Sequence, residues 1–236
     1  MSLSLKVLAI GAHPDDVEIG AGGTLARFFD EGHQTGLLSM TKAELSSNGT
    51  VERRLKEAGA AAEILGCSVC EHLSFPDRNL PTHRESIIEE VTYRIRKYQP
   101  EIVLAPWHQD RHPDHGHCGS LVKEAVFNAG IRNYKPDSLS AWKVSDLYYY
   151  AINSTEPFHV AYDISAYTTT KRHALEAFSS QFRKEEGTVT TPLNQGFIER
   201  IEARDRQTGF ECGTEAAEGF YKEGPVLMQS MIRRPL

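Results

Sequence analysis

Apolar runs of strand length alternate with amphipathic stretches of helical spacing through the first half of the chain. Residues 5–12 are almost continuously apolar, as in a strand covered on both faces, and residues 17–31 follow with helical spacing. The alternation continues with strands predicted at 34–41, 68–74 and 101–107, and helices at 50–65, 84–98 and 119–129. This order predicts a Rossmann-like α/β fold, a mostly parallel sheet with helices on both faces.

The second half of the chain has a less regular pattern. We expect strands at 147–152 and 160–164, and helices at 167–182 and 196–207. Neither a linker-like composition nor an internal repeat divides the sequence, so the prediction is a single domain over residues 1–236.

Composition and charge narrow the classes of partner. The net charge of −6 argues against nucleic acid, because a phosphate-binding surface carries basic excess. Apolar runs stay well short of the ~18 residues that span a bilayer, and the first residues lack a signal-peptide cleavage pattern. Four cysteines do not form a disulfide framework. We therefore expect a cytoplasmic protein that does not bind membranes.

Cys67 and Cys70 have the C-x-x-C spacing of some metal and redox sites. However, residues three apart on a strand point to opposite faces, and no second pair completes a structural zinc site. Buried or incidental thiols are the favoured interpretation.

The first predicted strand ends in the segment His13-Pro14-Asp15-Asp16. A dinucleotide-binding enzyme would have a glycine-rich phosphate loop here, and two adjacent carboxylates would repel a pyrophosphate. One aspartate could simply cap the following helix. Capping does not explain His13, which directs attention to a metal.

A second cluster follows the strand that ends at Trp107. Four histidines lie in the ten residues 108–117: His108, His112, His115 and His117. Both clusters follow parallel strands, so they are expected at the same edge of the sheet. Imidazole and carboxylate without thiolate suit Zn²⁺ or another first-row divalent ion, such as Fe²⁺. Spacing alone leaves open whether Asp15 or Asp16 is the ligand.

Together the two motifs resemble the zinc-dependent N-deacetylases of the LmbE/PIG-L family. Further segments resemble the branch that deacetylates N-acetylglucosaminyl-malate in bacillithiol biosynthesis: residues 43–50, 75–78, 111–117, 202–206 and 217–220. The resemblance covers most of the chain. It implies an LmbE-like fold, a cytoplasmic homo-oligomer (commonly a hexamer) and a small amino-sugar glycoside as substrate.

The resemblance also assigns roles to individual residues. It implies His13, Asp16 and His115 as zinc ligands and Asp15 as the general base. His112 would lie beside the scissile amide, and the Asp114 carboxylate behind it would fix its tautomer and favour its protonated form.

Substrate contacts are predicted from the same resemblance. Arg54 is the expected cation for the malate carboxylates, although Arg54 and Glu57 could form an ordinary surface pair. Asn48 and Asp77 are candidates for sugar hydroxyl contacts, or turn residues. Arg78, Arg111 and Arg132 are further cations that the sequence does not rank, and Phe197 stands where relatives often carry a tyrosine that could bind an oxyanion.

Three other functions share some of these features. The first is deacetylation of another small N-acetylglucosaminide. The second is a non-haem Fe(II) oxygenase, which also uses two histidines and one carboxylate. The third is a metal-binding or nucleotide-sensing module without catalysis. The spare carboxylate at Asp15 and the α/β order favour hydrolysis, and the lack of a membrane anchor disfavours a lipid substrate.

Overall fold

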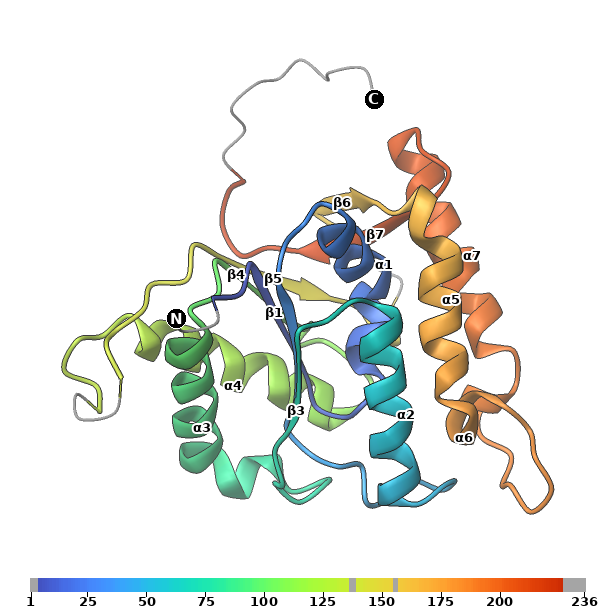
Figure 1. Ribbon diagram of the computed structural model, residues 1–236, viewed down its shortest axis with the longest axis horizontal. Helices are drawn as coiled ribbons and strands as arrows, with labels where there is room; N and C mark the ends of the chain where they lie inside the picture. Colours follow the sequence, from blue (N-terminus) through green and yellow to red (C-terminus); the bar gives the residue numbers. More distant parts are fainter. Residues whose placement is uncertain (1–3, 136–138, 155–156, 227–236) are drawn as a thin grey trace.

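A seven-stranded sheet forms the centre of the computed structural model, which describes residues 4–135, 139–154 and 157–226 (Figure 1). The strand order is β3-β2-β1-β4-β5-β7-β6. β1 to β5 run parallel, whereas β7 pairs antiparallel with both β5 and β6. The mostly parallel α/β fold is therefore confirmed. The strands are β1 (Val7–Gly11), β2 (Thr35–Ser39), β3 (Val69–His72), β4 (Ile102–Pro106), β5 (Asp146–Tyr150), β6 (Val160–Asp163) and β7 (Ala217–Tyr221).

Helices cover both faces of the sheet, as predicted (Figure 1). On one face, Leu8 and Ile10 of β1 pack in a cluster with α3 (Arg84–Tyr98) and α4 (Pro113–Ala129). On the other, Val7 and Ala9 pack with α1 (Asp16–Asp30), α2 (Val51–Ile64), α5 (Thr168–Ala177) and α7 (Phe197–Cys212). Alternate residues of β1 thus enter two separate cores.

The structure corrects three element predictions. The helix expected from residue 119 begins at Pro113, with His112 as its N-cap, because proline is preorganised for a first helical turn. The helix expected over 167–182 consists of a short 3-10 turn, α5 and the four-residue α6 (Ser179–Phe182), with non-helical backbone at Phe178. Strand β7 was not expected.

The order of the strands places a crevice beside β1. β2 lies on one side of β1 and β4 on the other, and the helices that follow β1 and β4 cover opposite faces. Such a switch in winding direction opens a crevice at the carboxyl ends of the strands, where ligands bind in open α/β sheets. Both His/Asp clusters follow these two strands.

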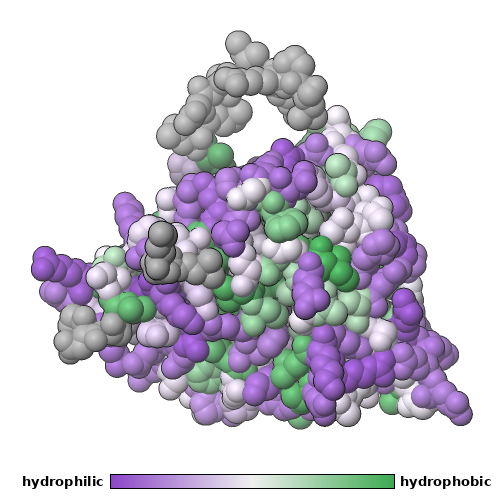
Figure 2. All heavy atoms as spheres, in the orientation of Figure 1, coloured by the Kyte–Doolittle hydropathy of each residue, from purple (hydrophilic) through white to green (hydrophobic). Residues whose placement is uncertain are grey.

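Hydrophilic side chains dominate the face of the molecule in Figure 2, with apolar residues scattered among them. Within the described ranges, no helix combines the length and the apolar character needed to cross a membrane.

Candidate active site

The turns after β1 and β4 bring the two clusters together. The rings of His13 and His115 lie 5.4 Å apart between centroids. Asp16 is the first residue of α1, and His115 lies in the first turn of α4. All three side chains are buried. The sheet thus brings the three ligands that the resemblance implied to one place.

The Asp16 carboxylate lies between the two imidazoles. Its Oδ1 is 3.1 Å from Nε2 of His115, and its Oδ2 is 3.6 Å from Nδ1 of His13. Donors that share a tetrahedral ion at ~2.0–2.1 Å lie roughly 3.3 Å apart, and each separation is close to that value, although the two involve different oxygens of Asp16. Among the described residues, two groups have ligand atoms that all lie within 4.8 Å of one another: His13, His112 and His115, and His13, Asp77 and Asp114. His112 is an alternative third ligand, because His13, His112 and His115 each have a ring nitrogen within 4.8 Å of the others.

Each ligand histidine has a second carboxylate behind it. Nε2 of His13 lies 3.1 Å from Asp77, and Nδ1 of His115 lies 3.0 Å from Asp110. Burial disfavours the charged imidazole of His115, but Asp16 and Asp110 outweigh it and raise its pKa to about 9. Metal-bound histidines characteristically donate their other nitrogen to such a carboxylate. The donor set therefore fits a divalent first-row ion.

Asp110 is a site residue for which the sequence predicted no role. It also accepts the His112 backbone N–H at 2.8 Å and two bonds from Asn153, at 3.0 and 2.9 Å. Burial opposes its ionisation, yet the bond with His115 leads the interactions that lower its pKa to about 2. The position of Asp110 in the His-rich segment could have indicated a role in the site. Its partner Asn153 could not be predicted, because it lies 43 residues away in the sequence.

Asp15 lies beside the ligand set with its carboxylate paired to Arg54 at 2.8 Å. Burial raises the pKa of Asp15 to about 6, opposed by the Arg54 guanidinium and reinforced by Asp16. A carboxylate with a pKa near the working pH suits a general base. The backbone of Asp15 has φ 111°, in the region that favours glycine.

Arg54, the predicted cation for the malate carboxylates, lines the pocket but already has protein partners. Its Nε and Nη2 donate to the Pro14 carbonyl at 2.9 and 2.7 Å, and Nη2 also binds Asp15. The alternative pair with Glu57 is wrong, because the partner of Glu57 is Arg53, at 3.0 Å. Arg54 instead holds the proposed base against the His13–Asp16 turn.

Contrary to the expectation from the sequence, the Asp114 carboxylate does not bind the His112 ring. The carboxylate accepts from the backbone and the guanidinium of Arg78 at 2.7 and 3.1 Å, and lies 3.7 Å from His13. Instead, the backbone N–H of Asp114 donates to Nδ1 of His112 at 3.3 Å. Burial, followed by the charge of His115, lowers the pKa of His112. The lowered pKa and the N–H donated to Nδ1 both favour an imidazole that is neutral and carries its proton on Nε2.

Both predicted sugar contacts, Asn48 and Asp77, already have hydrogen-bond partners within the protein. Asp77 lines the pocket, but its carboxylate binds His13 and the Leu45 backbone N–H. Asn48 points elsewhere and bonds with both backbone groups of Val189, at 2.9 and 2.8 Å. Asn48 therefore fastens one pocket loop to another, and its side chain takes up the turn-like role that was the alternative.

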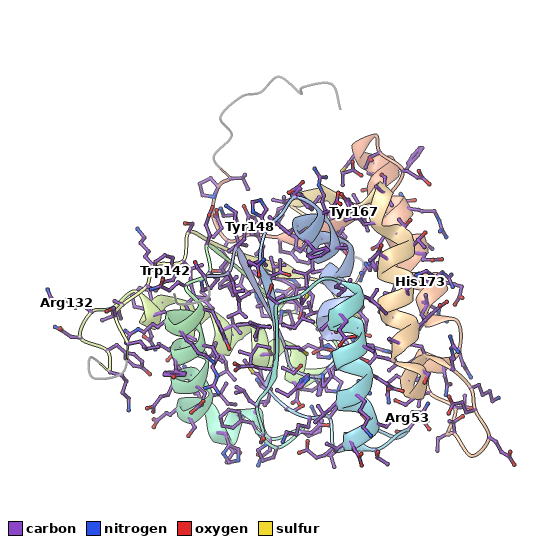
Figure 3. All side chains as sticks on the ribbon, viewed as in Figure 1. Arg53, Arg132, Trp142, Tyr148, Tyr167 and His173 are labelled. Carbon is purple, nitrogen blue, oxygen red and sulfur yellow. The ribbon has the colours of Figure 1, made fainter. Side chains whose placement is uncertain are left out.

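A cavity of about 590 Å³ opens onto these groups. Its lining includes Ser46 of the loop before α2, Leu193 of the segment before α7, and Phe197, the first residue of α7. The Phe197 ring stacks on Phe182, with 6.0 Å between ring centroids. Arg111 lines the cavity and is exposed; among the described residues no ion-pair partner of Arg111 is found. Arg132 is not among the residues that line the cavity, and Figure 3 shows it on a projecting loop at the left of the view.

Among the residues described, the two groups that could hold a metal ion are His13, His112 and His115, and His13, Asp77 and Asp114. Neither group includes the cysteines of the C-x-x-C segment. Burial raises the pKa of both Cys67 and Cys70 to about 12. This environment fits the interpretation of inert, incidental thiols.

Comparison with known proteins identifies the family. A family model described as PIG-L, GlcNAc-PI de-N-acetylase, matches residues 8–126. A diacetylchitobiose deacetylase of Thermococcus kodakarensis is 37% identical over 191 residues, which cover 75% of this chain and 70% of the relative. The chain belongs to the PIG-L family. This PIG-L chain is accordingly an N-deacetylase, which confirms the predicted class of enzyme.

Solved structures agree with this PIG-L fold over nearly the whole chain. The conserved protein TT1542 of Thermus thermophilus is 35% identical with a TM-score of 0.85, covering 98% of this chain and 100% of that one. An N,N'-diacetylchitobiose deacetylase of Pyrococcus horikoshii is 26% identical with a TM-score of 0.80, covering 92% and 83%.

Proposed function

We propose that this enzyme is a metal-dependent hydrolase that removes the N-acetyl group from N-acetylglucosaminyl-malate, as in bacillithiol biosynthesis. The single observation that carries the hydrolytic assignment is the placement of Asp16 between His13 and His115, with Asp15 beside them in a pocket. Family membership favours this chemistry over the Fe(II) oxygenase and the non-catalytic module.

His13, Asp16 and His115 would hold the ion, with Zn²⁺ or Fe²⁺ as the main choices. When bound, the ion would lower the pKa of a coordinated water and polarise the amide carbonyl. Asp77 and Asp110 fix the ring orientation of the two histidines from behind.

Asp15 is the proposed base of the reaction. It accepts a proton from water as the oxygen attacks the acetamide carbon, while Arg54 fixes the position of its carboxylate. The Nε2–H of neutral His112 is available to donate a hydrogen bond to the developing oxyanion. Because a neutral His112 is a poor acid, the proton on Asp15 returns to the nitrogen as the C–N bond breaks. Acetate and a free amine result.

Arg111 favours an anionic substrate. Its exposed guanidinium lines the same pocket without an ion-pair partner among the residues described, in a chain with a net charge of −6. A guanidinium binds a carboxylate with two parallel hydrogen bonds. Malate supplies two carboxylates, and Arg111 replaces Arg54 as the proposed contact.

The test is an amine-release assay on three substrates with and without a chelator. These are N-acetylglucosaminyl-malate, diacetylchitobiose and N-acetylglucosamine. We expect chelator-sensitive turnover that is fastest with the malate glycoside. Arg111→Met should lower kcat/KM for this substrate by roughly 10–100-fold, the value of a charged hydrogen bond, and leave diacetylchitobiose unaffected. Arg132→Met is the matched control outside the pocket.

Diacetylchitobiose is the second candidate substrate, because two relatives carry that name. Faster turnover of this neutral disaccharide, with no effect of Arg111→Met on any substrate, would replace the malate assignment. A second test concerns the base. Asp15→Asn should keep the ion and lose roughly 10²–10⁴ in rate. Near-normal turnover of the metal-loaded variant would remove Asp15 from the mechanism.

The homo-oligomer, a hexamer by resemblance, stays a prediction that sedimentation velocity can test. The cytoplasmic location also stays a prediction.

A further inference from the structure

Helix α1 is interrupted just after the residues that form the site. Ala21 has φ −146° and ψ 15°, outside helical geometry. A break of this kind deprives nearby backbone groups of their intrahelical partners. The buried Glu218 of β7 accepts two of the freed donors, from Gly23 at 2.9 Å and Thr24 at 2.7 Å. A residue almost 200 positions away thus supports the second half of α1.

Arg204 of α7 supports the first half of α1 and joins it to another segment. Its Nη2 donates to the Ile19 carbonyl at 2.9 Å, on the near side of the break. Its Nη1 donates to the carbonyls of Ala151 and Ile152 at 2.9 and 3.3 Å, directly after β5. One planar group therefore fixes the distance between α1 and the segment that follows β5.

Two further charges hold Arg204 and Glu218 in place. The Arg204 Nε lies 3.5 Å from Asp205, and Nζ of Lys171 lies 2.5 Å from Asp205 and 2.7 Å from Glu218. The four side chains alternate in sign, sum to zero charge, and are almost completely shielded from solvent. Breaking such a buried arrangement at one member leaves an uncompensated charge.

The two segments joined by Arg204 both reach the active site. Ile19 and Ile152 line the pocket. Ile19 lies three residues after the ligand Asp16 in the first turns of α1. On the other side, Asn153 follows Ile152 and donates twice to Asp110, the carboxylate behind His115.

We propose that Arg204 is a positioning residue for the metal site. This role rests on the proposed function. Arg204 holds the Asp16 side of the metal site at a fixed distance from the His115 side. It acts through Ile19 on one path and through Asn153 and Asp110 on the other, and touches neither ion nor substrate.

The experiment compares Arg204→Met with Arg96→Met. Arg96 of α3 is a buried arginine that donates to five backbone carbonyls at and after the end of α4, on the other face of the sheet. Both variants lose a buried carbonyl-binding arginine, so both should melt at a lower temperature. Binding of Zn²⁺ to the chelator-stripped protein is then measured by competition with a metal indicator, alongside kcat and KM for amine release.

We expect Arg204→Met to weaken Zn²⁺ binding by roughly 10–100-fold, the usual effect of removing a group that orients metal ligands. Its kcat should fall with little change in KM. Arg96→Met should keep the Zn²⁺ affinity and kcat within about twofold of wild type. Equal Zn²⁺ affinity in wild type and both variants would overturn the proposal, and so would an equal loss in the two variants.

If Arg204→Met does not fold, Arg204→Lys tests the positioning role instead. Lysine keeps the charge beside Asp205, but one nitrogen cannot occupy both the Nη1 and Nη2 positions. A loss of several-fold in Zn²⁺ affinity is expected, and wild-type affinity would overturn the proposal. If the wild-type protein binds Zn²⁺ but releases no amine, the proposed function is refuted, whereas the role proposed for Arg204 is not. Affinity differences among the variants would still decide the role of Arg204.

Discussion

The backbone of Asp15 predicts that glycine should be better tolerated there than alanine. At φ 111° a side chain is strained, and strain of this kind costs of order 1–3 kcal/mol. Asp15→Ala and Asp15→Gly both remove the carboxylate and leave Arg54 without its partner, so those losses cancel in the comparison. Only the presence of Cβ and the flexibility of the unfolded chain differ.

The magnitude follows from these two differences. Relief of strain favours glycine by about 2 kcal/mol, and the greater freedom of glycine in the unfolded chain removes roughly 0.5–1 kcal/mol. The net advantage of Asp15→Gly is about 1 kcal/mol in the free energy of unfolding. In a chain of 236 residues this corresponds to a melting temperature higher by roughly 2–4 °C.

The assay is denaturant and thermal unfolding in excess chelator, because a bound ion would stabilise the native state and obscure the comparison. Glu89, exposed in the middle of α3, supplies the control pair. At this helical position alanine should exceed glycine by about 0.5–1 kcal/mol, so the sign reverses. A melting temperature for Asp15→Gly at or below that of Asp15→Ala would refute backbone strain at the proposed base. Both variants should lose deacetylation.

Three further predictions concern the surroundings of the site. Asp110→Asn should weaken Zn²⁺ binding by roughly 10–100-fold by replacing the charged acceptor behind His115, measured by indicator competition; unchanged affinity would contradict its role. Asn48→Ala should raise KM more than it lowers kcat, because the loops that contain Asn48 and Val189 lose the hydrogen bonds that join them. The measurement is steady-state kinetics on the preferred substrate, and an unchanged KM would contradict this role of Asn48. Cys67 and Cys70 should resist iodoacetamide at pH 8 in the native protein, since their pKa values of about 12 leave little thiolate; rapid labelling seen by mass spectrometry would refute this.

Much of the fold could be predicted because local patterns carry it. The apolar run at 5–12 and the helical spacing after it express a buried parallel strand and its crossover helix. Strand β7 was missed because its antiparallel place between β5 and β6 depends on pairing with distant segments. The start of α4 was misplaced because the histidine cluster concealed the helix signal of Pro113.

The site could be predicted to the level of residue identity but not of side-chain direction. His13, Asp16 and His115 meet because parallel strands end at one edge of the sheet. The sequence could not show that Arg54 faces Asp15, nor that Asp114 turns its carboxylate toward Arg78. Such directions depend on rotamers and on partners from other elements.

The position of the site at the switch in winding explains why polar links are needed around it. α1 and α4 pack on opposite faces of the sheet, in two different hydrophobic clusters, so a shared apolar core does not align them. Their alignment depends instead on directional bonds, such as those of Asp16 with His115 and of Arg204 with the segment after β5. Substitutions in either apolar cluster should therefore cost mainly stability, whereas substitutions in these polar links should cost metal affinity and rate.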